Sequence, residues 1–132
     1  MTRAELNGVR FLQKELKMLE EELSEKRKAS ATIAPALDGL PKGSSLRSKV
    51  EALTMQILEL EERIANYKAA IPLAQAGLLD RLLSLSVKPS ERAVVILLYV
   101  EGQTVSEVTK RIGVTTRSVK RLQASFIKKM SS

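Results

Sequence analysis

Apolar residues recur at alternating intervals of three and four along two stretches in the first half of the chain. The first stretch holds Val9, Leu12, Leu16, Leu19 and Leu23, and the second holds Leu46, Val50, Leu53, Ile57, Leu60, Ile64, Tyr67 and Ile71. Helices that pack along a narrow apolar seam have this a/d pattern, with charged residues on their other faces. The pattern predicts two long, coiled-coil-like helices.

Local signals place the ends of these two helices. Thr2 and Glu5 fit a T-x-x-E capping box at the start of the first helix. The stretch PALDGLPKGSS (35–45) is rich in Pro, Gly and Ser, so we expect a connection at about 33–45. Pro72 lacks an N–H group, which predicts a kink or a restart there. Helices of comparable length, on the order of 40 Å, joined by a short connection favour an antiparallel helical hairpin.

Several large apolar residues lie off these seams. Phe11 and Met18 are seven residues apart in the first helix, and Met55 and Leu58 lie in the second. Apolar side chains of this size favour burial, so each helix is expected to contact a second neighbour. That neighbour is either the C-terminal part of the chain or a second copy. We favour the second copy, in a homodimer.

The last third begins with KPSERAVVILLYVE (88–101), which Gly102 closes. Its Val, Ile and Tyr residues would suit a strand by propensity. Pro and Ser at its start, and a glycine where a left-handed C-cap belongs, indicate a helix instead. The rest of the sequence offers no partner strand. We therefore predict a buried helix and an all-α fold.

A helix-turn-helix follows this buried helix. Thr104 and Glu107 form a second T-x-x-E box, which opens a short helix to about Ile112. Gly113 breaks this helix, and Thr115 is a ready N-cap for the next one. A short helix, a glycine turn and a basic helix are the layout of the DNA-binding helix-turn-helix.

The last helix, residues 115–130, is predicted to be the recognition helix. At about 100° per residue, its inward face holds Thr115, Val119, Leu122 and Phe126, and its outward face holds Arg117, Arg121, Ala124 and Lys128, with Lys120 beside them. The major groove admits such a helix, and arginine can contact guanine there through two hydrogen bonds. The predicted DNA-binding residues are Thr104, Thr115, Thr116, Arg117, Ser118, Lys120, Arg121 and Lys128. The alternative, a basic helix on anionic lipid, is disfavoured because the helix lacks a bulky aromatic wedge.

Composition supports the same interpretation. From Lys88 onward there are nine basic and three acidic residues, so this segment carries most of the formal net charge of +7. Such asymmetry is typical of a protein that binds a polyanion. The chain has no Cys and no His, which excludes disulfides and the common catalytic triads. We expect no enzyme activity, no metal, no cofactor and no membrane partner. The expected location is the interior of the cell.

The segment PSERAVVILLYVEGQTVSEVTKRIGVTTRSVKRLQASFIKKM resembles the region-4 helix-turn-helix of bacterial sigma factors. The matching elements are Pro89 to Arg92, Tyr99 to Gly102, Gly113 to Thr115, and Val119, Lys120, Arg121 and Leu122. Four residues before the turn glycine such motifs usually have alanine, whereas this chain has Thr109. The hydroxyl of Thr109 must therefore find a partner.

The overall layout is similar to small phage and prophage regulators of the RinA and ArpU type. Those join a helical N-terminal region to a sigma-region-4-like C-terminus. The expected domains are accordingly a helical hairpin for oligomerisation or partner binding at 1–86 and a DNA-binding domain at 87–132. The resemblance implies activation of late phage transcription, with double-stranded DNA as partner and host RNA polymerase as a further candidate. It also implies that the protein acts in the bacterial host cytoplasm, at the nucleoid. The operator, the regulated genes and the direction of regulation stay open.

Two alternatives stay open beside this interpretation. One is a phage small terminase subunit, which also combines a helix-turn-helix with an oligomerising hairpin. The other is a sigma-like protein that binds RNA polymerase. A complete sigma factor is disfavoured, because melted promoter DNA is held by stacking on aromatic rings. The chain has only four aromatic residues, and they are dispersed.

Overall fold

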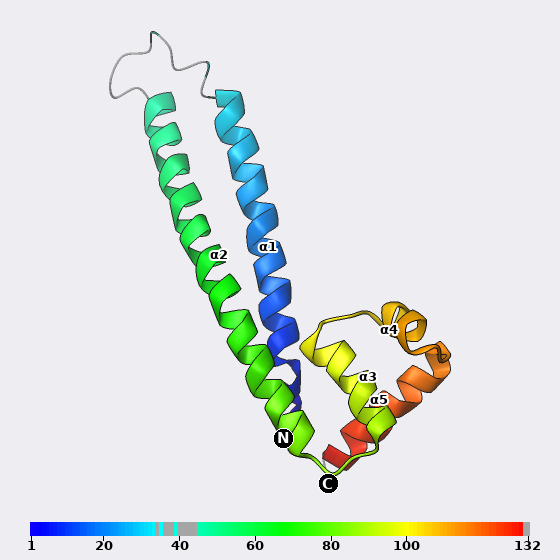
Figure 1. The fold of residues 1–132 in the computed structure, drawn as a ribbon. Helices are drawn as coiled ribbons and strands as arrows, with labels where there is room; N and C mark the ends of the chain where they lie inside the picture. The colour runs from blue at the N-terminus through cyan, green and yellow to red at the C-terminus, as the bar shows by residue number, and fades with distance from the viewer. Residues whose placement is uncertain (34, 36–38, 40–44, 131–132) are drawn as a thin grey trace. The chain divides into compact units, whose positions relative to one another are not determined.

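The computed structural model describes residues 1–33, 35, 39 and 45–130, and the predicted connection at 33–45 lies mostly outside them. The elements in chain order are α1 (Arg3–Ile33), α2 (Ser45–Ser84), α3 (Pro89–Val95), the π-helical turn η2 (Ile96–Val100), α4 (Val105–Ile112) and α5 (Thr116–Met130) (Figure 1). The described ranges contain no strand, and the predicted all-α fold is confirmed. None of these helices combines the length and the apolar character that crossing a bilayer requires.

The chain forms two compact units. One unit consists of residues 14–69, and the other combines residues 1–13 with residues 70–132. Both α1 and α2 contribute residues to each unit. The boundary that the sequence predicts between residues 86 and 87 stays a prediction.

The unit of residues 14–69 is an antiparallel pair formed by parts of α1 and α2, which run side by side in Figure 1. Its core consists of the predicted seam: Leu23, Leu60 and Ile64 are buried, and Leu16, Leu19 and Ile57 pack against them. Polar contacts also join the helices. Arg27 forms an ion pair with Glu61 at 3.0 Å, and the hydroxyl of Tyr67 donates to the carboxylate of Glu15. The predicted seams are therefore confirmed as the faces along which the helices pack.

The large apolar residues off the seams are exposed. Phe11 is 54% exposed, Met18 67%, Met55 58% and Leu58 54%. Within a single chain these four side chains lie in solvent, at an unfavourable hydration cost. A second neighbour for these faces stays a prediction.

Helix α2 runs without interruption from Ser45 through Pro72 to Ser84, so the helix does not restart there, and the alternative of a kink stays a prediction. Pro72 is exposed, so water can hydrogen-bond the carbonyl of Lys68, which loses its helical donor. Beyond the proline, Leu78 and Leu82 are buried and hold this end of the helix in place. With 31 residues in α1 and 40 in α2, the helices measure about 46 and 60 Å. They are less equal in length than the seams suggested.

The second unit has one apolar core built from both ends of its sequence. Its buried members are Leu6, Val9, Leu78, Leu82, Val94, Val95, Leu98, Tyr99, Val100, Val108, Val119 and Phe126. The predicted capping box fixes the start of α1, because the amide of Glu5 donates to Thr2 Oγ1 at 3.1 Å and the amide of Thr2 donates to the carboxylate of Glu5 at 3.3 Å. The same carboxylate pairs with Arg81 of α2 at 2.8 Å. The first turns of α1 and the end of α2 thus belong to the core of the helix-turn-helix.

The predicted helix at 88–101 is confirmed, but its second half is wound as the π-helical turn η2. This turn ends with the amide of Glu101 donating to the carbonyl of Ile96 at 3.1 Å. The side chain of Gln75 donates to the carbonyl of Val100 at 2.9 Å. Gly102 then adopts a φ of +69°, as predicted for a left-handed helix stop.

Candidate nucleic-acid interface

Helix α4 begins with the predicted capping box. The amide of Glu107 donates to Thr104 Oγ1 at 3.2 Å, and the amide of Thr104 donates to the carboxylate of Glu107 at 3.3 Å. These bonds satisfy two backbone donors that a helix start otherwise leaves unpaired. The hydroxyl of Thr104 is therefore engaged in holding α4, although the residue is exposed.

The turn between α4 and α5 has the geometry that the sequence predicts. Gly113 ends α4 with a φ of +80°, and its amide donates to the carbonyl of Thr109 at 2.9 Å. The amide of Ser118 donates to Thr115 Oγ1 at 3.2 Å, so Thr115 caps α5. The hydroxyl of Thr109 donates to the carbonyl of Ser106 at 2.6 Å. That bond gives the hydroxyl a partner inside its own helix, and the departure from alanine is accommodated.

The inner face of α5 is apolar and packed. Val119 is 0% and Phe126 1% exposed, and Leu122 packs against the same core. The amide nitrogen of Gln123 donates to the hydroxyl of Tyr99 at 2.6 Å, which ties α5 to η2. Thr115 was also predicted to face inward, but it is exposed. It lies before the first turn of α5, where its hydroxyl serves the cap instead of the core.

The outer face of α5 carries a row of exposed side chains, which we call the basic row: Arg117, Lys120, Arg121, Ala124 and Lys128. Within the described part of the chain, none of its four cations has an acidic partner within 4.0 Å. Uncompensated positive charges close together repel one another and attract a polyanion. The row thus has the charge and the exposure that contact with nucleic acid requires.

From Lys88 onward the chain has three acidic side chains, and all three are paired with groups outside the basic row. Glu107 serves the α4 cap, and Glu101 pairs with Arg111 at 3.5 Å. Glu91 is 2% exposed and accepts hydrogen bonds from Lys129 Nζ at 3.0 Å and from Ser125 Oγ at 2.8 Å. The bond from Lys129, followed by that from Ser125, lowers the pKa of Glu91, although burial acts in the opposite direction. Lys129 is therefore held by an internal carboxylate.

The predicted site residues are thus brought together on one stretch of the chain but differ in what they can offer. Arg117, Lys120, Arg121, Lys128 and Thr116 are exposed. The hydroxyls of Thr104, Thr115 and Ser118 are used in helix caps. Their contact with DNA stays a prediction, as it does for the rest of the set.

Sequence reasoning missed Lys110, which lies exposed in the last turn of α4. No acidic side chain of the described ranges lies within 4.0 Å of its amine. The first helix of a helix-turn-helix crosses the DNA backbone, so a cation there is placed to contact phosphate. Its position three residues before the turn glycine was the available signal.

Comparison with protein families identifies this part of the molecule. Residues 85–131 match the family model described as sigma-70, region 4. They form a DNA-binding helix-turn-helix of that type, and the predicted resemblance is confirmed for this segment. The match leaves residues 1–84 outside it. Comparisons with curated proteins and with solved structures gave no match.

Proposed function

We propose that the protein is a sequence-specific transcriptional regulator that reads duplex DNA with α5 in the major groove. The observation that carries the proposal is the basic row, backed on the opposite side of the same helix by Val119 and Phe126. Because the apolar face of α5 is buried, the cations on its opposite face must point toward solvent. The match to region 4 supports the same use of the helix.

Within this proposal the residues of α5 have different tasks. Arg117 and Arg121, one turn apart near the start of the helix, contact base edges, because arginine can offer guanine two parallel hydrogen bonds. Lys120 and Lys128, with Lys110 on α4, contact phosphates, which set position and contribute affinity without reading sequence.

The direct test uses Arg117→Ala, Arg121→Ala and the double variant. The operator is first obtained by selection from a pool of random duplexes. We expect each single change to weaken operator binding by about 1–3 kcal/mol and to relax base preference at one position. Arg63→Ala is a matched control, because Arg63 is an exposed arginine of the hairpin. Full operator affinity in the double variant, with unchanged circular dichroism, would refute the role of α5.

The finer function that we propose is activation of late phage genes. It is supported by the layout of a helical region before a region-4-type segment, which is similar to regulators of the RinA and ArpU type. Such a protein acts in the cytoplasm of a bacterial host. Mapping its bound sites on the parent genome tests the proposal. Sites upstream of packaging and structural genes, together with lower transcription when the protein is absent, are the expected result.

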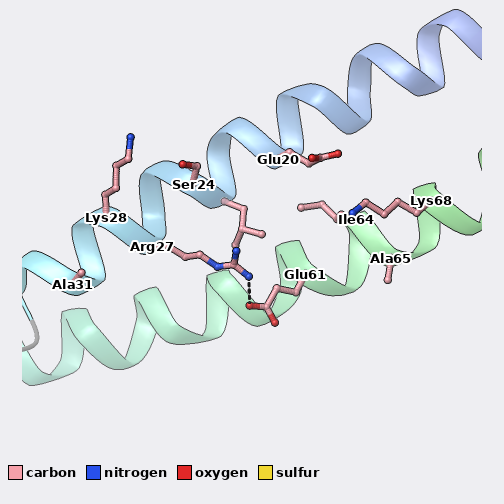
Figure 2. Close-up of a pocket in the computed structure, with 10 residues that line it drawn as sticks. Glu20, Ser24, Arg27, Lys28, Ala31, Glu61, Ile64, Ala65 and Lys68 are labelled. Atoms are coloured by element: carbon pink, nitrogen blue, oxygen red, sulfur yellow. Dashed lines mark hydrogen bonds and ion pairs between the residues drawn. The ribbon is translucent and has the colours of Figure 1, made fainter. Parts of the chain in front are cut away.

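We further propose that the hairpin of residues 14–69 forms a homodimer. A groove of about 630 Å³ runs along this hairpin, and Leu23, Ala31, Ile64 and Ala65 form its apolar part (Figure 2). The Arg27–Glu61 pair, which lines the groove, joins the two helices. Residues 14–69 contain ten acidic and ten basic residues, so two copies can face one another without net repulsion. Met18, Met55 and Leu58 are also exposed on this hairpin, and burying any of them against a second copy would be favourable.

Sedimentation velocity at tens of micromolar distinguishes the proposals for the whole protein. A dimer supports the regulator. A ring of about eight or more subunits would favour a small terminase subunit, since closed rings arise from repeated head-to-tail contacts. A species that stays monomeric would refute the dimer. If such a monomer also bound RNA polymerase, the result would favour a sigma-like role.

A further inference from the structure

A second cationic feature lies beside α5, where the start of α1 meets it. A groove of about 400 Å³ is lined by Arg3, Lys120, Gln123, Ala124, Ile127 and Lys128. All of these residues belong to the unit formed by residues 1–13 and 70–132. We call this feature the Arg3 groove. It combines one side chain of α1 with five of α5.

The charge of the Arg3 groove is one-sided. Arg3, Lys120 and Lys128 bring three cations to it, and no lining residue is acidic. Within the described ranges none of these three side chains has an ion-pair partner. The nearest acid along α1, Glu5, is paired with Arg81 and bonded to Thr2. The repulsion among the three cations is therefore not relieved by the protein itself.

The position of Arg3 is fixed by the fold. Leu6 and Val9, in the next turns of α1, are buried in the core beneath α5. The Thr2–Glu5 capping box holds the first turn, and the side chain of Asn7 donates to the carbonyl of Arg3 at 2.9 Å. An arginine on a docked and capped helix is preorganised, so it loses less freedom on binding than a cation on a loose arm.

We infer that the Arg3 groove holds the DNA backbone, with Arg3 as a phosphate contact that α1 supplies to the helix-turn-helix. This inference rests on the proposed function, because Lys120 and Lys128 belong to both the groove and the basic row. A duplex that α5 reads must pass these two lysines, which brings its phosphates to the mouth of the groove. The groove offers little for reading bases, because the amide nitrogen of Gln123 is bonded to Tyr99. Arg3 thus adds affinity and position, whereas sequence is read elsewhere.

The test measures binding of the intact protein to a random-sequence duplex of about 30 base pairs, long enough for two half-sites. The variants are Arg3→Ala, Arg3→Lys and Lys128→Ala, with Lys17→Ala as a charge-matched control on an exposed part of α1. We expect Arg3→Ala to weaken binding about fivefold to tenfold for each bound subunit, as for loss of one charge-assisted contact. The slope of log affinity against log salt should become shallower by about 0.9 for each bound subunit, one phosphate contact apiece. Arg3→Lys should keep the slope, and Lys17→Ala should match the wild type.

The outcomes separate this inference from the proposed function. If Arg121→Ala weakens operator binding while Arg3→Ala leaves affinity and slope unchanged, the Arg3 groove is not a DNA contact and the proposed function stands. If no variant changes binding, both fail. If Arg3→Ala weakens DNA binding only as much as Lys17→Ala, the loss of affinity comes from the lower net positive charge of the protein and not from a contact at Arg3. That result would overturn the inference. Base preference measured on the selected operator should be the same in Arg3→Ala and wild type, and a changed preference would also overturn the phosphate role.

Discussion

Glu91 shows how one side chain can hold α5 in place. It lies in the first turn of α3, and its carboxylate is buried against α5. There it binds the Ser125 hydroxyl at 2.8 Å and the Lys129 amine at 3.0 Å. Because a buried charge is costly without partners, these two bonds make its burial tolerable. They also remove Lys129 from the set of cations that DNA can contact freely.

The lowered pKa of Glu91 sets the direction of a pH effect. A carboxyl whose pKa is lower in the folded than in the unfolded state contributes stability above its ordinary pKa, and that stability is lost as pH falls through the lowered value. We therefore expect the Tm of the wild type to fall as the pH drops below 4.5, the ordinary value for this group. Glu91→Gln should have a lower Tm at neutral pH and a weaker acid dependence. Thermal unfolding followed by circular dichroism at several pH values measures both.

Two further variants control this experiment. The pKa of Glu5 is also lowered, chiefly by the backbone bond from Thr2, so Glu5→Gln shows how much of the acid dependence belongs to the start of α1. Lys129→Met should lower the Tm more than Glu91→Gln does, because it removes the cation and leaves the carboxylate buried. The reverse order of these two Tm values would contradict the account of the pair.

Glycine is required at Gly113 and Gly102 by the backbone itself, since their φ values are +80° and +69°. We expect Gly113→Ala to lower the free energy of unfolding by about 1–2 kcal/mol, the cost of a left-handed conformation for a residue with a Cβ. Urea denaturation measures the change. A new Cβ at Gly113 would meet nothing within 4 Å, and one at Gly102 would meet only the end of the flexible Gln13 side chain, which can move aside. Gly102→Ala should therefore cost about as much as Gly113→Ala.

At the scale of elements, variants of a helix-cap residue can distinguish a role in folding stability from a role in DNA binding. Thr104 was predicted to contact DNA, but its hydroxyl closes the capping box of α4. We expect Thr104→Ala to lower the free energy of unfolding by about 1 kcal/mol, as for loss of an N-cap. Thr104→Ser should keep the stability, because serine can form the same cap. If the alanine variant is stable but binds DNA more weakly than the serine variant, the hydroxyl acts on DNA as well.

Features set by short-range spacing were predictable from the sequence. Both capping boxes, the glycine stops and the two seams depend on residues three or four apart, and all of them are confirmed. The seams could even have been extended, because Leu6 precedes Val9 by three residues, and Leu78, Leu82 and Leu85 continue the second seam beyond Pro72.

Contacts between distant residues were not predictable in this way. The π-helical end at Val100 accepts a bond from Gln75, 25 residues earlier. The Glu91 carboxylate meets Lys129 at a separation of 38 residues, and Arg10 lies over the ring of Tyr99. A single sequence carries no periodic signal for such pairs, because they depend on how complete helices pack. The same reason hid the Arg3 groove, whose members come from both ends of the chain.

At the scale of the whole molecule, the helix-turn-helix shares its core with the ends of the long helices. Leu6 and Val9 of α1 and Leu78 and Leu82 of α2 are buried together with the residues of α3 to α5. Burial of each such side chain contributes about 1.5–3 kcal/mol. Their sum is comparable with the total stability of a small domain, about 5–15 kcal/mol. A DNA-binding segment cut at residue 87 loses all four.

We therefore expect two shortened versions of the protein to behave differently. The fragment of residues 88–132 should be largely unfolded at 25 °C, because it lacks Leu6, Val9, Leu78 and Leu82. A version in which a short Gly–Ser linker replaces residues 14–69 keeps residues 1–13 and 70–132, which form one compact unit. It should fold as a monomer and bind random duplex with about half the salt slope of the dimeric wild type, because one subunit makes half the phosphate contacts. Circular dichroism, sedimentation and binding at two salt concentrations measure these properties.

The linker version also tests what the hairpin of residues 14–69 does. A single helix-turn-helix reads only a few base pairs, and a dimer gains affinity by holding two half-sites at a fixed spacing. Without the hairpin, operator binding should fall toward the affinity for random duplex, whereas contacts made by the basic row and by Arg3 should persist. If the linker version binds the operator as tightly as the intact protein, the hairpin does not pair two readers. Its exposed Met18, Met55 and Leu58 would then be better explained as a surface for another protein, and RNA polymerase is the first partner to test.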